Sequence, residues 1–256
     1  MRPNRVKELW RTGKPVSTGW CSTVDPYATE AMARAGFDAL ILDMQHGMAI
    51  GPERAATWLQ IVAQTETTPI VRIPWNEPSF AQWVLDAGAM GIIIPMVNNV
   101  ADAKRAIGAC RYPPVGYRSY APNRAAFYGP DYFAKANEEI ICLVMLETLE
   151  AIANAEAIAD LPGFDGFFVG PIDLGVSMGI APFSEHKDSR HPDALRRVVE
   201  VAKAHGQVAG VFATSPAEAV QRFREGFNLN PSFLDMWSLA AASSRAVSEF
   251  RDLSAG

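Results

Sequence analysis

The chain has little cysteine, no excess of basic residues and no long hydrophobic run. Its three cysteines, Cys21, Cys110 and Cys142, are odd in number and widely spaced, which argues against a disulfide framework and against a zinc knuckle. The formal net charge of -5 lacks the basic excess typical of nucleic-acid binding. No stretch is apolar enough for a signal peptide or a membrane span. We therefore expect a small-molecule protein in a reducing, cytoplasmic setting, without nucleic-acid or membrane partners.

The chain is long enough for a sizeable core. With 256 residues, 49% of them hydrophobic and 20% charged, one domain over residues 1–256 is expected. Short apolar runs alternate with longer helical patterns. Strands are predicted at 16–21, 38–43, 69–73, 91–95, 140–147, 164–170, 208–213 and 227–234, and helices at 26–36, 51–63, 78–87, 99–109, 149–160, 193–205, 216–225 and 235–250.

Eight strands, each followed by a helix, predict an α/β fold of the (β/α)8 TIM-barrel type, because open doubly wound sheets usually have fewer strands. The Asp25-Pro26 pair is a helix-start signal. Residues 111–130 form an irregular segment. The last strand contains Pro231, which cannot donate a ladder hydrogen bond.

Polar side chains follow several predicted strands, at the end where such barrels carry their chemistry. Trp20 ends the first strand, Asp43, Gln45 and His46 end the second, Arg72 ends the third, Glu147 ends the fifth, and Asp173 follows the sixth. Two carboxylates converging at an open barrel mouth suit Mg2+ or Mn2+. Such an ion can act as a Lewis acid on a bound 2-oxo acid.

Four of these residues have a structural alternative. Glu147 could instead pair with Arg72 or Arg118, and Asp173 could be the N-cap of a helix beginning at Leu174. Arg72 could neutralise charge on a keto oxygen or form a salt bridge at the barrel rim. His46 could move protons, with Asp86 as the partner that sets its tautomer, or be structural.

Other groups point away from competing chemistries. The six lysines fall in predicted helices, tails or loops, so a Schiff-base lysine is disfavoured. No glycine-rich phosphate loop follows strand seven or eight, which makes phosphorylated substrates and nucleotides unexpected. His186 and His191 lie in a charged insertion that we expect to be solvated.

Nine segments together resemble the HpcH/HpaI family of class II (metal-dependent) 2-oxo-acid aldolases, in order and over nearly the whole chain. The segments are Asp25-Pro-Tyr, Gly36-Phe-Asp, Asp43-Met-Gln-His, Val71-Arg-Ile, Leu85-Asp-Ala-Gly-Ala, Ile94-Pro-Met-Val, Arg111-Tyr-Pro-Pro-Val-Gly-Tyr-Arg118, Leu146-Glu-Thr and Val169-Gly-Pro-Ile-Asp-Leu.

The resemblance implies a divalent metal (Mg2+, Mn2+ or Co2+) on Glu147 and Asp173, and a pyruvate-like acid beside Arg72. It also implies a His46 and Asp86 acid-base dyad. Substrate-binding positions that follow from it are Trp20, Gln45, Arg72, Gly170, Pro171, Leu174, Arg118 and Tyr120. The implied reaction is reversible cleavage of a 4-hydroxy-2-oxo acid to pyruvate, or hydroxypyruvate, and an aldehyde.

The resemblance further implies a homohexamer, a trimer of dimers that exchange the C-terminal helix, here 235–250. Met236, Leu239, Val247 and Phe250 lie on one face of that helix. The 111–130 loop would then lie near an active site at a subunit boundary.

The chain departs from the family pattern at three places. Gln45 stands where many relatives carry Glu, Ser119-Tyr120 replaces an expected glycine, and the last strand contains Pro231. Two rivals stay open: an acyl-CoA lyase of the citrate lyase beta or malyl-CoA lyase type, and a non-catalytic barrel that binds a 2-oxo acid.

Overall fold

The computed structural model describes residues 1–48 and 51–254, with the backbone only at residue 186. Its eight strands are all parallel and follow the sheet order β7-β6-β5-β4-β3-β2-β1-β8. A bridge between Gly210 and Leu229 links the two outer strands, so the sheet nearly closes into the predicted TIM barrel. The strands are β1 (Ser17–Cys21), β2 (Ala39–Asp43), β3 (Thr68–Arg72), β4 (Gly91–Ile94), β5 (Ile141–Leu146), β6 (Gly166–Val169), β7 (Val208–Val211) and β8 (Asn230–Leu234).

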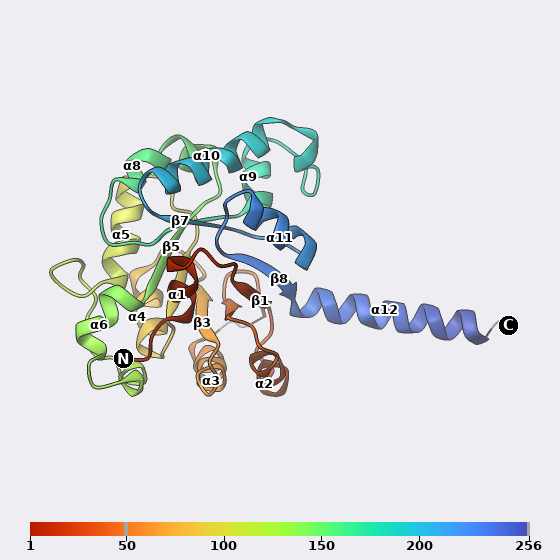
Figure 1. The fold of residues 1–256 in the computed structure, drawn as a ribbon, viewed down its shortest axis with the longest axis horizontal. Coiled ribbons are helices and arrows are strands. Elements are labelled where there is room, and N and C mark those ends of the chain that lie inside the picture. Colours follow the sequence, from red (N-terminus) through yellow and green to blue (C-terminus); the bar gives the residue numbers. More distant parts are fainter. Residues whose placement is uncertain (49–50, 255–256) are drawn as a thin grey trace.

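The helices surround the sheet, as Figure 1 shows. They are α1 (Arg5–Arg11), α2 (Pro26–Arg34), α3 (Pro52–Val62), α4 (Pro78–Asp86), α5 (Val100–Cys110), α6 (Tyr132–Glu139), α7 (Leu149–Ala153), α8 (Ala155–Ala159), α9 (Pro171–Ser177), α10 (Arg190–Ala204), α11 (Pro216–Arg224) and α12 (Asp235–Ser254), with 3-10 turns η1 (Ala125–Tyr128) and η2 (Glu185–Lys187). None of the helices in this part of the chain is both long and apolar enough to span a membrane.

Most predicted elements are confirmed, and the differences have local causes. Asp25 caps α2 by accepting the Ala28 N–H at 2.8 Å. The expected helix at 149–160 is broken at Asn154 into α7 and α8. Helices α1 and α6 were not predicted; α1 depends on Asn4, whose side chain accepts the Val6 and Lys7 N–H groups. The Asp173 N-cap alternative is wrong, because Gly170 holds the cap position and Asp173 lies within the first turn of α9.

Strand β8 exists despite Pro231. The register of β1 against β8 shifts between Thr18 and Gly19, which is a bulge beside the proline. The Ser232 hydroxyl donates to the Thr18 carbonyl at 3.2 Å, so a side chain satisfies a backbone acceptor near the irregular pairing.

The last helix differs from the others in its packing. Helix α12 has no buried residue, and Figure 1 shows it as a straight rod that projects away from the barrel to the C-terminus. Its apolar side chains Leu239 and Phe250 are 59% and 72% exposed. The barrel of this chain therefore leaves the apolar face of α12 uncovered.

Candidate active site

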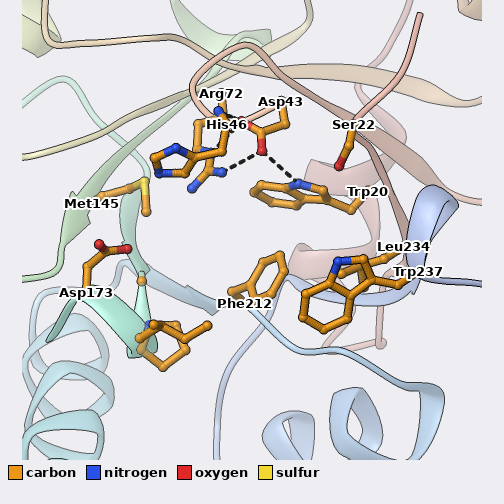
Figure 2. A pocket seen from close by; sticks show the side chains of 13 residues that line it. Trp20, Ser22, Asp43, His46, Arg72, Met145, Asp173, Phe212, Leu234 and Trp237 are labelled. Atoms are coloured by element: carbon orange, nitrogen blue, oxygen red, sulfur yellow. Dashed lines mark hydrogen bonds and ion pairs between the residues drawn. The ribbon is translucent and has the colours of Figure 1, made fainter. Parts of the chain in front are cut away.

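A cavity of about 230 Å³ opens at the carboxyl ends of the strands. Figure 2 shows Asp173 across this cavity from a wall formed by Phe212, Leu234 and Trp237. The cavity brings together six of the predicted site residues, from β1, β2, β3 and the turn after β6: Trp20, His46, Arg72, Gly170, Pro171 and Asp173. The topology places these side chains together because parallel strands present their carboxyl ends at the same rim.

Asp43, which the sequence also places at a strand end, lines one side of the cavity and orients its neighbours there. Both of its oxygens accept from Arg72, Oδ1 from Nε at 3.0 Å and Oδ2 from Nη2 at 2.6 Å. The indole of Trp20 donates to Oδ2 at 3.3 Å and lies under the guanidinium, 4.7 Å from the ring centre. Figure 2 shows these contacts as dashed lines. The structure thus places Arg72 in an ion pair at the rim and also at the cavity.

The surroundings of Asp43 stabilise its ionised form. Burial alone would raise its pKa, but the Arg72 hydrogen bond and charge, with the N–H groups of His46 and Gln45, hold the pKa of this carboxyl below its usual range. The backbone N–H groups of Gln45 and His46 donate to Oδ1 at 3.0 and 3.1 Å. Asp43 therefore orients both Arg72 and the loop that carries His46.

Glu147 pairs with neither arginine that the sequence offered. It is 2% exposed, and its Oε1 accepts the Met96 N–H at 2.7 Å. Its other oxygen lies against Gly170, where an added Cβ would be 2.5 Å from Oε2. Burial raises the pKa of Glu147 to about 7; the Met96 N–H opposes this rise, and nearby Asp173 adds to it. Glu147 is thus a buried carboxylate without a bonded cation among the described side chains.

The two carboxylates suit a hard cation that keeps several water ligands. Glu147 lies behind the Gly170 wall, whereas Asp173 is exposed and lines the cavity. No group of three or more His, Cys, Asp or Glu side chains converges on a metal position within residues 1–48 and 51–254, the side chain at 186 aside. A cation here would therefore have two protein carboxylates and open positions.

Asp86, Arg118 and Tyr120 lie outside the cavity lining. The Asp86 carboxylate accepts from Arg118 Nη2 at 2.7 Å, and the Arg118 guanidinium lies 4.5 Å from the Tyr112 ring centre. Burial raises the pKa of Asp86, while Arg118 opposes that rise. Tyr120 packs against Tyr112 and Phe133. Among the described contacts of this chain, Asp86 makes no hydrogen bond to His46, so the predicted dyad is not assembled here.

Two further predicted positions are not part of the cavity surface. Leu174 is fully buried beneath the turn, and Gln45 is half-buried, with an amide oxygen that has no hydrogen-bond partner among the described residues. Sequence reasoning missed Phe212, Leu234 and Trp237, which form the apolar wall. Phe212 lies near the end of the predicted seventh strand, so its strand-end position was the available signal.

Comparison with known sequences identifies the family. Residues 17–236 match the family model described as HpcH/HpaI aldolase/citrate lyase. The hydroxypyruvate/pyruvate aldolase of Rhizorhabdus wittichii is 37% identical, covering 98% of this chain and all of the relative. The 4-hydroxy-2-oxo-heptane-1,7-dioate aldolase of Salmonella dublin is 36% identical, covering 84% of this chain and 82% of the relative.

Solved structures give the same assignment. A family protein from Burkholderia cenocepacia superposes with a TM-score of 0.88 and 32% identity, covering 97% of this chain and 99% of that one. The citrate lyase beta subunit of M. tuberculosis, complexed with oxaloacetate and magnesium, is more distant, with a TM-score of 0.56 and 17% identity over 86% of this chain and 91% of that one. With its barrel, strand-end carboxylates and full-length relatives, the chain belongs to the HpcH/HpaI aldolase/citrate lyase family.

Proposed function

We propose that this chain is a metal-dependent aldolase that reversibly cleaves a 4-hydroxy-2-oxo acid to pyruvate, or hydroxypyruvate, and an aldehyde. The observation that carries the proposal is the buried Glu147, which has no bonded cation among the described side chains and stands next to Asp173. Arg72 and His46 border the same cavity. Full-length relatives named as aldolases support a carbon–carbon lyase over a binding barrel.

Glu147 and Asp173 would hold the cation, which we take to be Mg2+ or Mn2+, with Co2+ as another candidate. When bound, such an ion supplies Lewis-acid stabilisation of negative charge on the substrate oxygens. The donor set fits because both ligands are carboxylates and one is buried without a counter-ion. A soft metal that prefers thiolates is a poor match for these oxygens.

Arg72 would bind the keto oxygen side of the substrate. Asp43 occupies its Nε and Nη2, while Nη1 donates to no residue in the described part of the chain. The bidentate pair and the Trp20 ring hold the guanidinium in place, so it needs no reorganisation as charge develops on the substrate. The Gly170 and Pro171 backbone, with Leu174 beneath it, would border the acid end of the substrate.

His46 would move the proton of the substrate 4-hydroxyl group. Its backbone is held by Asp43, and its ring lines the same cavity as Arg72. A neutral imidazole is a suitable proton acceptor near pH 7. The apolar wall of Phe212, Leu234 and Trp237 would exclude water on the aldehyde side. An Asp86 that partners His46 within this chain would have to leave Arg118. Alternatively, Asp86 would reach His46 from another subunit, and Arg118 and Tyr120 would come with it.

We also infer a homo-oligomer, a hexamer built as a trimer of dimers. The support is α12, which extends away from the barrel with Leu239 and Phe250 exposed. Uncovered apolar faces of this length normally pack against a partner. Light scattering of the full chain should give a mass several times 27.8 kDa; a monomer at micromolar concentration would contradict the inference.

The test of the activity is pyruvate release from a panel of 4-hydroxy-2-oxo acids with Mg2+ or Mn2+. Glu147→Gln should lower turnover by at least about 100-fold. Glu150→Gln, an exposed carboxylate three residues further on, is the matched control and should retain turnover. No release of pyruvate or hydroxypyruvate by metal-loaded protein would rule out the aldolase. Cleavage of acyl-CoA thioesters instead would favour the acyl-CoA lyase alternative.

A further inference from the structure

His191 is buried, although its sequence context predicted a solvated position. It is the second residue of α10 and is only 5% exposed. Its ring Nε2–H donates to the Pro171 carbonyl at 2.8 Å. Nε2 therefore carries a proton, because a carbonyl only accepts. His191 thus contacts the first residue of α9 from twenty positions away in the chain.

The contacted turn separates two cavities. Pro171, Ile172 and Phe212 line the candidate active site on one side, and on the other side they line a second cavity that also includes His191. His191 therefore supports the back of the wall whose front faces the substrate position. Because Asp173 lies two residues after Pro171 on the same turn, a shift of Pro171 moves Asp173 as well.

Besides the buried Leu174 side chain, the start of α9 has few other attachments in the described part of the chain, and its cap makes no side-chain hydrogen bond. Its N-cap is Gly170, which has no side chain, and its first residue is a proline, which has no N–H. The neighbouring Arg190 donates from Nη2 to the Met178 carbonyl at 3.2 Å, at the other end of α9. Arg190 is largely exposed, so that contact is weakened by solvent. The bond from His191 is shorter, at 2.8 Å, and is made by a side chain that is only 5% exposed, so it is the stronger of these two attachments between α10 and α9.

Glu147 is held by a different part of the chain. Its carboxylate accepts from the Met96 N–H, in the loop after β4, and this bond does not involve α9. The separation between Glu147 and Asp173 therefore depends on where α9 begins. In a metal site, loss of a group that orients a ligand typically lowers metal affinity by about 10- to 100-fold.

We infer that His191 is a positioning residue for the cation site, which sets the place of Asp173 relative to Glu147 through the Pro171 carbonyl. The inference rests on the proposed function, since it assumes that these two carboxylates bind a divalent cation. His191 itself touches neither substrate nor metal. Its effect passes through the backbone of the Gly170–Asp173 turn.

The test is Mn2+ affinity of the full-length protein, measured by electron paramagnetic resonance without substrate. His191→Leu keeps an apolar side chain but removes the donor, and it should weaken Mn2+ binding about 10- to 100-fold. His191→Gln can still reach Pro171 with an N–H and should stay within about three-fold of the unchanged chain. His191→Asn is too short to reach and should resemble His191→Leu, which covers the case in which the leucine variant does not fold.

His205→Phe provides the matched control. His205 also bonds a backbone carbonyl through its ring, that of Val201 at 2.9 Å, but it lies at the opposite end of α10, and its substitution should leave Mn2+ affinity unchanged. Equal Mn2+ affinity of the Gln and Asn variants, with the unchanged chain binding Mn2+, would overturn the positioning role alone. If the unchanged chain binds no Mn2+, the proposed metal site fails and this inference fails with it.

Discussion

Two carboxylates at the mouth of the barrel are equally buried and have opposite electrostatic environments. Asp43 is 3% exposed and Glu147 is 2% exposed. Asp43 has a bidentate arginine, two backbone N–H donors and the Trp20 indole. Among the described residues, Glu147 has one backbone N–H donor and an acidic neighbour, and Arg72 acts on it only through its charge, without a bond. The pKa of Asp43 is lowered and that of Glu147 is raised to about 7.

The difference shows that partners, and not burial, decide which carboxylate can take a cation. Asp43 is already neutralised by Arg72, so a further cation would gain little there and would compete with the arginine. Glu147 is costly to ionise in this chain, and a bound cation removes that cost. The same rim therefore contains one group that orients a cationic side chain and one that is available to a metal.

The largest expected effect is that of Asp43→Asn. The substitution leaves the Arg72 guanidinium buried without a counter-charge, and removal of one partner of a buried pair costs about 3 kcal/mol or more of unfolding free energy. Chemical denaturation at pH 7 measures it. Because the lowered pKa of Asp43 stabilises the fold only while the group is ionised, the difference between the two proteins should shrink as the pH falls below about 4.

The control for this prediction is Asp193→Asn. Asp193 pairs with Arg196 on the surface of α10, with both side chains more than half exposed, and such pairs contribute under about 0.5 kcal/mol. A loss below about 1 kcal/mol for Asp43→Asn would mean that the Arg72 pair is not the organising contact of the rim.

In metal-free protein, Glu147→Gln should raise the free energy of unfolding, whereas Asp43→Asn lowers it. A buried carboxyl with a raised pKa destabilises the fold once it is ionised, so stability falls as pH rises from about 4.5 to about 7. The amide removes this penalty, and we expect a gain of roughly 2 kcal/mol at pH 8 and almost none at pH 4. Thermal unfolding in the presence of a chelator measures the gain.

Added metal should make the unchanged chain more stable than Glu147→Gln, which reverses the order of stability expected without metal. With millimolar Mn2+, the unchanged chain should gain stability by mass action, while Glu147→Gln should not. A Glu147→Gln protein that is less stable than the unchanged chain at pH 8 without metal would show that the carboxylate already has a stabilising partner.

Gly170→Ala tests the close approach of Gly170 to the Glu147 carboxylate behind the cavity. The added Cβ would lie 2.5 Å from Glu147 Oε2 and 3.2 Å from Met145 Cε, so the turn or the carboxylate has to move. Overpacking of this kind costs about 1–2 kcal/mol. Denaturation measures the loss, and Mn2+ affinity should fall as well. Gly206→Ala meets no neighbour, but φ of +67° makes the alanine backbone strained; it should also lose stability, and as a control for the metal site it should leave Mn2+ affinity unchanged. Unchanged Mn2+ affinity in Gly170→Ala would show that the position of the Gly170 turn does not affect the metal site.

The strand-end half of the site could be predicted from the sequence, because barrel topology alone fixes which residues share the rim. Trp20 and Arg72 lie at the ends of apolar strands, His46 and Asp173 lie shortly after such strands, and the structure brings all four to one cavity. Pro231 was compatible with β8 because a bulge and the Ser232 hydroxyl accommodate it, and neither is visible in a propensity pattern.

The rest of the candidate site could not be predicted, because it depends on tertiary contacts that the spacing of residues in the sequence does not encode. Asp86 ends α4, and Arg118 lies 32 positions later in an irregular loop, yet the two pair directly. Sequence reasoning placed Asp86 with His46 instead. The burial of His191 was missed for a similar reason, since its charged neighbours predicted solvent and its partner is a backbone carbonyl. Backbone acceptors have no sequence signal.

The smallest expected effect concerns the one donor that Glu147 has. Met96 adopts a left-handed backbone conformation with φ of 55°, which costs most residues about 1 kcal/mol and costs asparagine less. Met96→Asn keeps the N–H that bonds Glu147, and the strain relieved is partly offset by lost apolar contact of a half-buried side chain. We expect a change within about 0.5 kcal/mol by denaturation and no change in Mn2+ affinity. A tenfold loss of that affinity would show that the Met96 side chain, and not only its backbone, holds Glu147 in place.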